Sequence, residues 1–256
     1  MHTNRVRIVG IGLAGAIVLA GAACSTPPKD PVKRAEYERR NDPFEKFNRR
    51  VHRVNVWIDH NIGRPVARVY AKRVPQFIRD RIRTFADHLG EPITFMNDVL
   101  QGERERAAET AVRFFVNSVA GMAGFFDVAA MYGLKRHTED FGQTLAVWGV
   151  RAGPYLVLPV LGPSSTRHLA GRIVDGIADP LNWVGKPTVA RVFFGTAGPL
   201  GQIDFYARNV DQLKSIEKNS LDYYAALRSF YRQNRKSAIA NGRIKTKDIP
   251  LPGDDE

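Results

Sequence analysis

Apolar residues recur every three or four positions along most of the chain, whereas stretches that alternate between apolar and polar residues are scarce. This spacing is typical of amphipathic helices rather than of strands. In the first such segment, residues 42–62, Asp42 is placed to cap a helix, Pro43 suits the first turn and Glu45 completes a capping box. The apolar face of this predicted helix consists of Phe44, Phe47, Val51, Val54 and Ile58.

The segment 74–102 contains residues that disfavour a continuous helix. Gly90 and Pro92 lie in its middle, and Gly102 follows its last apolar position. Proline removes a backbone hydrogen bond, and glycine is the commonest helix stop. We therefore predict two short helices that are separated near Gly90 and Pro92 and end at Gly102.

The strongest helical pattern spans residues 103–133. Gly121 and Gly124 interrupt it, so it predicts two helices that meet closely. Its apolar positions are Val112, Phe115, Val116, Val119, Met122, Phe126 and Ala130.

Helical spacing continues in residues 165–185 and 198–242, with an interruption at Asn219 and Ser220. In the last region we expect a buried side made of Phe205, Val210, Leu213, Ile216, Leu221, Tyr224, Leu227 and Tyr231. Together these patterns predict an all-α fold, with a single domain over residues 41–243 that is built from many short and medium amphipathic helices.

Residues 153–165, "GPYLVLPVLGPSS", are strongly apolar but contain prolines at 154, 159 and 163. A helix that spans a membrane cannot accommodate them all, so we predict a loop broken by proline. The stretch either lines an apolar passage or fills the core.

The N-terminus has the features of a secretory signal. Arg5 and Arg7 precede an apolar run from Ile8 to Ala23, which is shorter than the roughly 20 residues that a spanning helix needs. We therefore expect residues 1–23 to be a signal peptide.

Cys24 is the only cysteine, so it cannot form an internal disulfide. Its position at the end of the apolar run resembles that of the lipidated first residue of bacterial lipoproteins, and Ser25 resembles the outer-membrane sorting case. Gly21 stands where a large aliphatic residue is usual, since Leu19 lies two positions earlier. Cleavage by ordinary signal peptidase after residues 20–22 is the alternative.

Charge and composition describe an exported globular protein with two loose ends. The chain has 256 residues, 44% of them hydrophobic, and a net charge of +12. Since an exported chain meets little nucleic acid, this charge points to anionic lipid headgroups or acidic proteins as partners and not to nucleic acid. Residues 24–40 are expected to be a tether and residues 244–256 a disordered tail.

The sequence contains no recognisable catalytic or metal-binding motif. The histidines outside the signal show no HExxH or paired spacing, so we expect them to be solvated, and we expect no metal or cofactor. Ser164, Ser165 and His168 lack a nucleophile elbow and are expected to cap a helix over residues 166–175 instead.

Five segments in order, spread over about 140 residues, share a pattern with a known family. They are 41–55, 90–102, 113–129, 139–175 and 179–183, and the most specific stretch is "FGQTLAVWGVRAGPYLVLPVLGPSS". Together they resemble the MlaA family of Gram-negative lipoproteins, and the unusual Gly21 before Cys24 is the main departure.

The resemblance implies a ring of helices around an amphipathic channel, lodged in the inner leaflet of the outer membrane. Phospholipids misplaced in the outer leaflet would pass through it to a soluble periplasmic carrier, and the protein would associate with trimeric porins without catalysing a reaction. A structural lipoprotein that braces porins or envelope, and an exported lipid hydrolase, are the alternatives.

Within this expectation, Arg151 is placed to meet a lipid phosphate, and Gly149 and Gly153 beside it are expected to act as hinges. The predicted channel wall consists of Arg151, Tyr155, Leu156, Leu158, Val160 and Leu161. Trp148 and Trp183 suit either a membrane interface or the core.

Overall fold

The computed structural model describes residues 30, 32, 42–180 and 188–243. The predicted signal peptide, Cys24, Trp183, the tail from residue 244 and most of the predicted tether lie outside the described residues. Over these ranges the chain is helical apart from one two-stranded sheet, so the predicted all-α class is confirmed. The elements are α3 (Glu45–Ile58), the π-helix η1 (Asp59–Gly63), α4 (Arg64–Arg73), α5 (Gln76–Gln101), α6 (Arg104–Val119), α7 (Val128–Met131), α8 (Phe141–Val147), β1 (Tyr155–Leu158), β2 (Gly162–Ser165), α9 (Thr166–Ala178), α10 (Thr188–Asn219) and α11 (Tyr223–Ile239).

Helix α3 begins later than the sequence predicted. It starts at Glu45 and has no side-chain cap. The carboxylate of Asp42, expected to cap it, is buried and accepts hydrogen bonds from Asn48 (2.7 Å), Tyr224 and Arg228 (3.0 Å). The capping prediction was wrong because three donors, two of them on the distant helix α11, already use this carboxylate.

Helix α5 is continuous where two helices were predicted. It runs through Gly90 and Pro92 and ends, as predicted, at Gly102, whose φ of 78° forms a left-handed C-cap. Proline costs the helix a hydrogen bond, but α5 packs against α6, α8 and α10. This tertiary packing outweighs the local preference that the sequence pattern reports.

The predicted break between α6 and α7 is confirmed. Residues 120–127 form turns in which Gly121 and Gly124 are tightly enclosed. A Cβ at Gly121 would lie 2.2 Å from the carbonyl oxygen of Phe126, and a Cβ at Gly124 would overlap the ring of His88. Only glycine allows the chain to reverse this closely.

Helices α10 and α11 are separated by a turn at residues 220–222, next to the predicted interruption. Val210 and Tyr224 are buried as predicted, whereas Phe205 and Leu221 are exposed. The prediction was wrong for Phe205 because the part of α10 that packs on α4 and α5 also buries polar side chains such as Asp204, and wrong for Leu221 because it lies in the turn.

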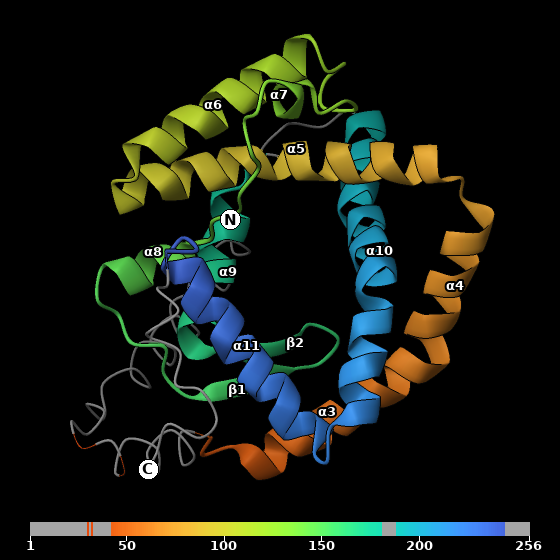
Figure 1. Cartoon of the computed structure of the whole chain (residues 1–256), viewed down its shortest axis with the longest axis vertical. Coiled ribbons are helices and arrows are strands. Elements are labelled where there is room, and N and C mark those ends of the chain that lie inside the picture. The colour runs from red at the N-terminus through yellow and green to blue at the C-terminus, as the bar shows by residue number, and fades with distance from the viewer. Residues whose placement is uncertain (1–29, 31, 33–41, 181–187, 244–256) are drawn as a thin grey trace, which may run out of the picture.

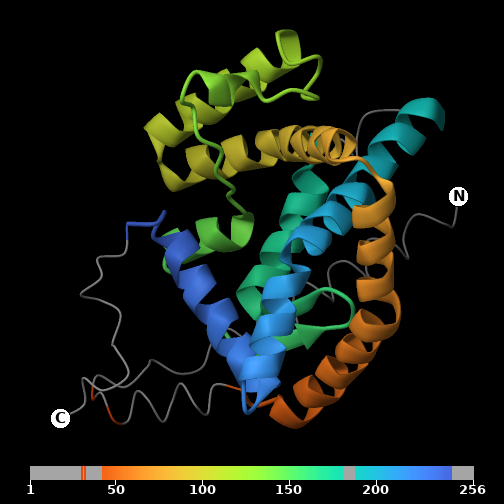
Figure 2. The same cartoon turned by 45° about the vertical axis from the view of Figure 1, so that its right-hand side comes forward.

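The contacts between elements close into a ring (Figure 1). The α3 helix contacts β1, the hairpin contacts α9 and α11, and α9 contacts α8. The α8 helix contacts α5, α5 contacts α10, α10 contacts α4, and η1 joins α4 back to α3. Figure 2 shows α4 and α10 running along the same flank of the molecule. The helices of the described residues therefore have the ring arrangement that the resemblance implied.

Polar side chains occupy the contacts within this ring, and many large apolar ones lie on its surface. Trp57 is 61% exposed and Phe115 is 68% exposed. Extensive exposed apolar surface marks a site of contact with a membrane, a partner protein or an apolar ligand. No helix among the described residues is long and apolar enough to cross a bilayer. The largest fully buried side chains are Asn48, Asn97, Thr144, Asp98, Asp204 and Ser164.

The buried charges pair with one another. Arg113 donates from Nε to Glu91 (3.1 Å) and from its other nitrogens to Asp127 (3.0 Å) and the carbonyl of Leu134 (2.5 Å). Burial acts to raise the pKa of Asp127, but the bonds from Arg113 and Asn117 hold that pKa below its usual value. Asp127 therefore stays ionised, and the network ties α5 and α6 to the turn before α7.

Candidate functional site

The stretch 153–165, predicted to be a loop, folds as a small antiparallel hairpin. Strands β1 and β2 pair so that Leu158 faces Gly162, and the turn between them holds Pro159 and Val160, whose φ is 65°. The loop prediction was wrong because Pro154 precedes β1, Pro159 lies in the turn, and Pro163 lies on a short strand with few ladder bonds to lose. Side chains of α3 supply hydrogen-bond partners for the backbone of β1.

The predicted channel residues are distributed over two faces and a tip. Tyr155 is 3% exposed and lies in the core. Leu156 and Leu158 alternate with the buried positions and are half-buried. Val160 and Leu161 form the tip and are 75% and 61% exposed. The structure brings these residues together on one hairpin, but only the tip presents a fully open apolar surface.

Two asparagines of α3 hold the free edge of β1. Asn48 donates from Nδ2 to the carbonyl of Tyr155 (3.0 Å), and its Oδ1 accepts from the N–H of Val157 (2.9 Å). Asn55 donates to the carbonyl of Leu158 (2.9 Å) and accepts from the N–H of Val160 (2.8 Å). These amides replace the partners that a third strand would provide, so the backbone of this edge is satisfied without water.

Sequence reasoning missed Asn48 and Asn55, although a signal was present. The two residues lie about two helical turns apart, on one face of an otherwise amphipathic segment. A repeated amide at that spacing places two paired donors and acceptors on one helix face, where they can bond either to water or to a backbone. The sequence does not say which of the two they meet.

The inner face of the hairpin packs against α11. The ring of Tyr155 lies 6.0 Å from that of Tyr224 and 5.9 Å from that of Tyr231, measured between centroids. Burial raises the pKa of both Tyr155 and Tyr224 well above the usual range, so both remain neutral phenols. Tyr155 is therefore an anchor of the hairpin, in line with the core alternative for this part of the stretch.

The predicted hinge glycines both have left-handed backbones, with φ values of 86° at Gly149 and 68° at Gly153. A Cβ at Gly149 would meet no atom within 4 Å, but a Cβ at Gly153 would lie 1.9 Å from Oγ1 of Thr166. Arg151 lies between them with an exposed side chain. The left-handed backbones explain why glycine occupies both positions, and the hinge motion remains a prediction.

The serines at the end of the hairpin make a helix cap, as the sequence predicted. Oγ of Ser165 accepts from the N–H of His168 (3.2 Å) at the start of α9. Ser164 is fully buried. The hydroxyl of Ser165 therefore serves the helix terminus.

Two histidines contradict the expectation that all are solvated. His52 and His88 are buried, and the ring of His88 stacks on that of Phe114 at 4.8 Å. They pack as flat aromatic groups, which a sequence pattern cannot distinguish from surface histidines. Among the described residues, no group of three or more histidine, cysteine or acidic side chains is placed to hold a metal ion.

Fold and site together define a class of protein, a single helical domain that is closed into a ring. Polar side chains lie in the contacts between its helices, and apolar side chains, including those of the hairpin tip, are exposed. Comparison with known families gives the particular family. The model of the MlaA lipoprotein family matches residues 40–238. This chain belongs to the MlaA lipoprotein family.

Similar proteins agree with this assignment. The chain is 31% identical to the intermembrane phospholipid transport system lipoprotein MlaA of Haemophilus influenzae, over 98% of this chain and 97% of that protein. It is 32% identical to the protein of the same name from Escherichia coli K12, over 96% and 94% of the two chains. A chain solved in work on the structural basis for maintenance of bacterial outer membrane lipid asymmetry superposes with a TM-score of 0.67 at 31% identity, covering 77% of this chain and 98% of the other.

Proposed function

We propose that this protein lies in the inner leaflet of the outer membrane and passes misplaced phospholipids from the outer leaflet to a soluble periplasmic carrier, thereby maintaining lipid asymmetry. The names of the relatives, which describe intermembrane phospholipid transport, support this proposal. No catalytic step is part of it.

The observation that carries the proposal is the distribution of polarity around the ring. Exposed apolar side chains such as Trp57 and Phe115 suit contact with acyl chains, and buried polar side chains satisfy the backbone and one another. A lipid has two apolar tails and a charged head, so a protein that moves it must offer both kinds of surface. A ring with this polarity provides them without a spanning helix.

The hairpin is the proposed moving part of the passage. Val160 and Leu161 at its tip supply the apolar contact, and Leu156 and Leu158 extend it along one face. Gly149 and Gly153 act as hinges, and Arg151 between them offers its guanidinium to the lipid phosphate.

Anchoring and partners complete the proposal. Cys24 carries the lipid anchor, and a trimeric porin holds the protein in the outer membrane. Mass spectrometry of the purified mature protein tests the anchor: a mass that corresponds to an acylated Cys24 is expected. A mass that corresponds to an unmodified thiol, or to cleavage before this residue, contradicts it.

The passage is tested with Val160→Asp in cells that lack the wild-type protein. The side chain is exposed, so the variant should fold and accumulate normally. A charge at the tip should oppose the passage of lipid tails, because a charged group is costly in an apolar environment. We expect phospholipid to accumulate in the outer leaflet, measured by labelling intact cells with a membrane-impermeant amine reagent.

The matched control is Val69→Asp, at an exposed valine on α4. It adds the same charge to apolar surface away from the hairpin and should leave lipid asymmetry closer to normal. Equal accumulation in the two variants would show that the hairpin is not the passage. Normal asymmetry without the protein would favour the structural role of bracing porins.

A further inference from the structure

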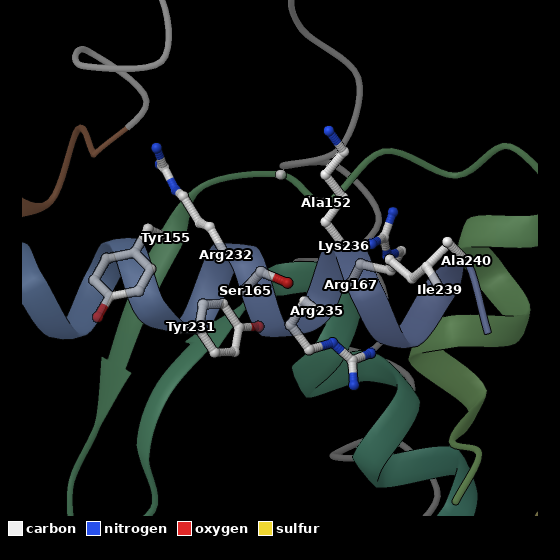
Figure 3. Close-up of a pocket in the computed structure, with 11 residues that line it drawn as sticks. Ala152, Tyr155, Ser165, Arg167, Tyr231, Arg232, Arg235, Lys236, Ile239 and Ala240 are labelled. Carbon is white, nitrogen blue, oxygen red and sulfur yellow. The ribbon is translucent and has the colours of Figure 1, made fainter. Parts of the chain in front are cut away.

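A pocket beside the base of the hairpin is strongly basic (Figure 3). It has a volume of about 400 Å³. It lies between residues 152–153, the start of α9 and the C-terminal half of α11. Among the described residues that line it, four are cations and none is acidic. The cations are Arg167, Arg232, Arg235 and Lys236.

Arg235 and Arg167 differ in how their hydrogen-bonding groups are satisfied. Arg235 donates two bonds to Asp140, at 2.5 and 2.9 Å, and the pair is largely buried. Arg167 donates from one terminal nitrogen to the carbonyl of Val150 (2.6 Å), but its Nε is buried without a hydrogen-bond partner. An unsatisfied donor on a buried cation is costly unless an acceptor reaches it.

The electrostatics of Arg167 also favour an incoming anion. Burial and the nearby charge of Arg235 lower the pKa of Arg167. An anion that lies between these groups would offset both effects, because it restores a polar partner and opposes the repulsion between the cations. Such an anion needs several acceptor oxygens to serve several donors.

The remaining wall is aromatic and apolar. Tyr155 and Tyr231 line one end, and Ile239 and Ala240 line the other. Figure 3 shows that Arg232 and Lys236 project from α11 to the same side, whereas Arg235 points to the opposite one. The pocket thus places cations next to apolar groups, and its volume is within the range of small-molecule sites.

We infer that this pocket binds the phosphate of a phospholipid headgroup, with Arg167, Arg232 and Lys236 as donors and the tyrosine and isoleucine side chains beside the glycerol and first acyl carbons. The inference rests on the proposed function and adds to it a resting site for the headgroup at the base of the hairpin. Arginine suits this role because its planar donors match phosphate oxygens.

The test is native mass spectrometry of the full mature protein in a neutral, phosphate-free detergent. Phosphatidylglycerol is titrated in parallel with diacylglycerol of the same chain length, and the bound fraction gives each affinity. The wild-type protein should prefer phosphatidylglycerol. The double variant Arg232→Gln with Lys236→Gln removes two charge-assisted hydrogen bonds, so it should bind phosphatidylglycerol at least about tenfold more weakly and bind diacylglycerol unchanged.

The control is Lys72→Gln with Arg73→Gln, which removes the same charge from exposed positions on α4 and should bind like the wild type. Equal affinity of the pocket variant and the wild type, or no preference for phosphatidylglycerol, would overturn the inference. A wild-type protein that binds no phospholipid at all would instead contradict the proposed function.

Two competitors identify the source of the anion. Displacement of phosphatidylglycerol by inorganic phosphate at comparable concentration would support the phosphate chemistry and show that free phosphate also binds. Resistance to inorganic phosphate would support a lipid headgroup held by its tails as well. Displacement by hexaglutamate at concentrations where phosphate has no effect would overturn the inference in favour of an acidic protein partner.

Discussion

Single amide side chains determine how the hairpin is attached to the ring. Asn48 is fully buried and serves a donor and an acceptor of β1 together with the carboxylate of Asp42. Each of these groups is enclosed by protein, so none can turn to water if the amide is lost. The attachment therefore depends on these few polar side chains as well as on the apolar cluster around Tyr155 and Val157.

Asn48→Leu should destabilise the protein by about 3 kcal/mol, because it leaves buried hydrogen-bonding groups without partners. The thermal unfolding midpoint in detergent measures this loss. Asn61→Leu is the control, since Asn61 is exposed and bonds only within its own turn, to the carbonyl of Trp57. A midpoint for Asn48→Leu as high as that of the control would refute the assignment.

His168 predicts a specific dependence of stability on pH. Burial, and then the charge of Arg235, lower its pKa from 6.5 to about 4, so the fold favours the neutral ring. The unfolded chain binds more protons between these values, and stability should therefore be lost as the pH falls from 6.5 towards 4. His168→Gln should show a shallower loss over this window in thermal unfolding. An identical slope in the two proteins would contradict the prediction.

The elements show how far local pattern determines this fold. The break after α6, the stop at Gly102 and the cap at Ser165 were predictable, because glycine conformations and caps are local properties. The continuity of α5 through Pro92 was not, because it depends on packing against helices distant in sequence. The hairpin was also unpredictable, since the partners of β1 are side chains of α3.

The two glycines before the hairpin should differ in their tolerance of a side chain. Gly149→Ala should cost about 1 kcal/mol, the price of a left-handed backbone, since the space around it is open. Gly153→Ala should cost more, because the new Cβ would collide with Thr166. Thermal unfolding compares the two variants.

The collision also predicts a rescue. Thr166→Ala in the Gly153→Ala background should recover part of the lost stability, because it removes the oxygen 1.9 Å from the new Cβ. Absence of any recovery would mean that backbone strain alone accounts for the loss.

For the protein as a whole, the sequence predicts which helix faces are apolar, but it does not predict whether each face contacts the protein core or lipid. The spacing of Phe115 and Val119 predicts one apolar face, and the same spacing serves a buried core or a lipid surface. Both side chains are exposed in the ring. The error at Phe205 has the same origin, since an apolar side was assumed to be a buried side.

The fluorescence of Trp57 can show whether this apolar surface contacts lipid or water. The chain has three tryptophans, and replacing Trp148 and Trp183 by phenylalanine leaves Trp57, which is 61% exposed, as the only one. In vesicles, lipids brominated on their acyl chains should quench its fluorescence strongly, and aqueous iodide should quench it weakly. The reverse order would place this face of α3 in water and remove the basis of the leaflet proposal.

The joint between Asp42 and α11 has a consequence for biogenesis. Tyr224 and Arg228 reach a carboxylate 182 and 186 positions earlier in the chain. During export from the N-terminus, the carboxylate of Asp42 lacks both donors until α11, the last described helix, has crossed the membrane. A chain shortened before Tyr223 would keep the contacts that close the ring, because none of them runs through α11. It would leave this carboxylate with Asn48 as its remaining donor, so the N-terminal end of the ring would be tethered to the hairpin alone.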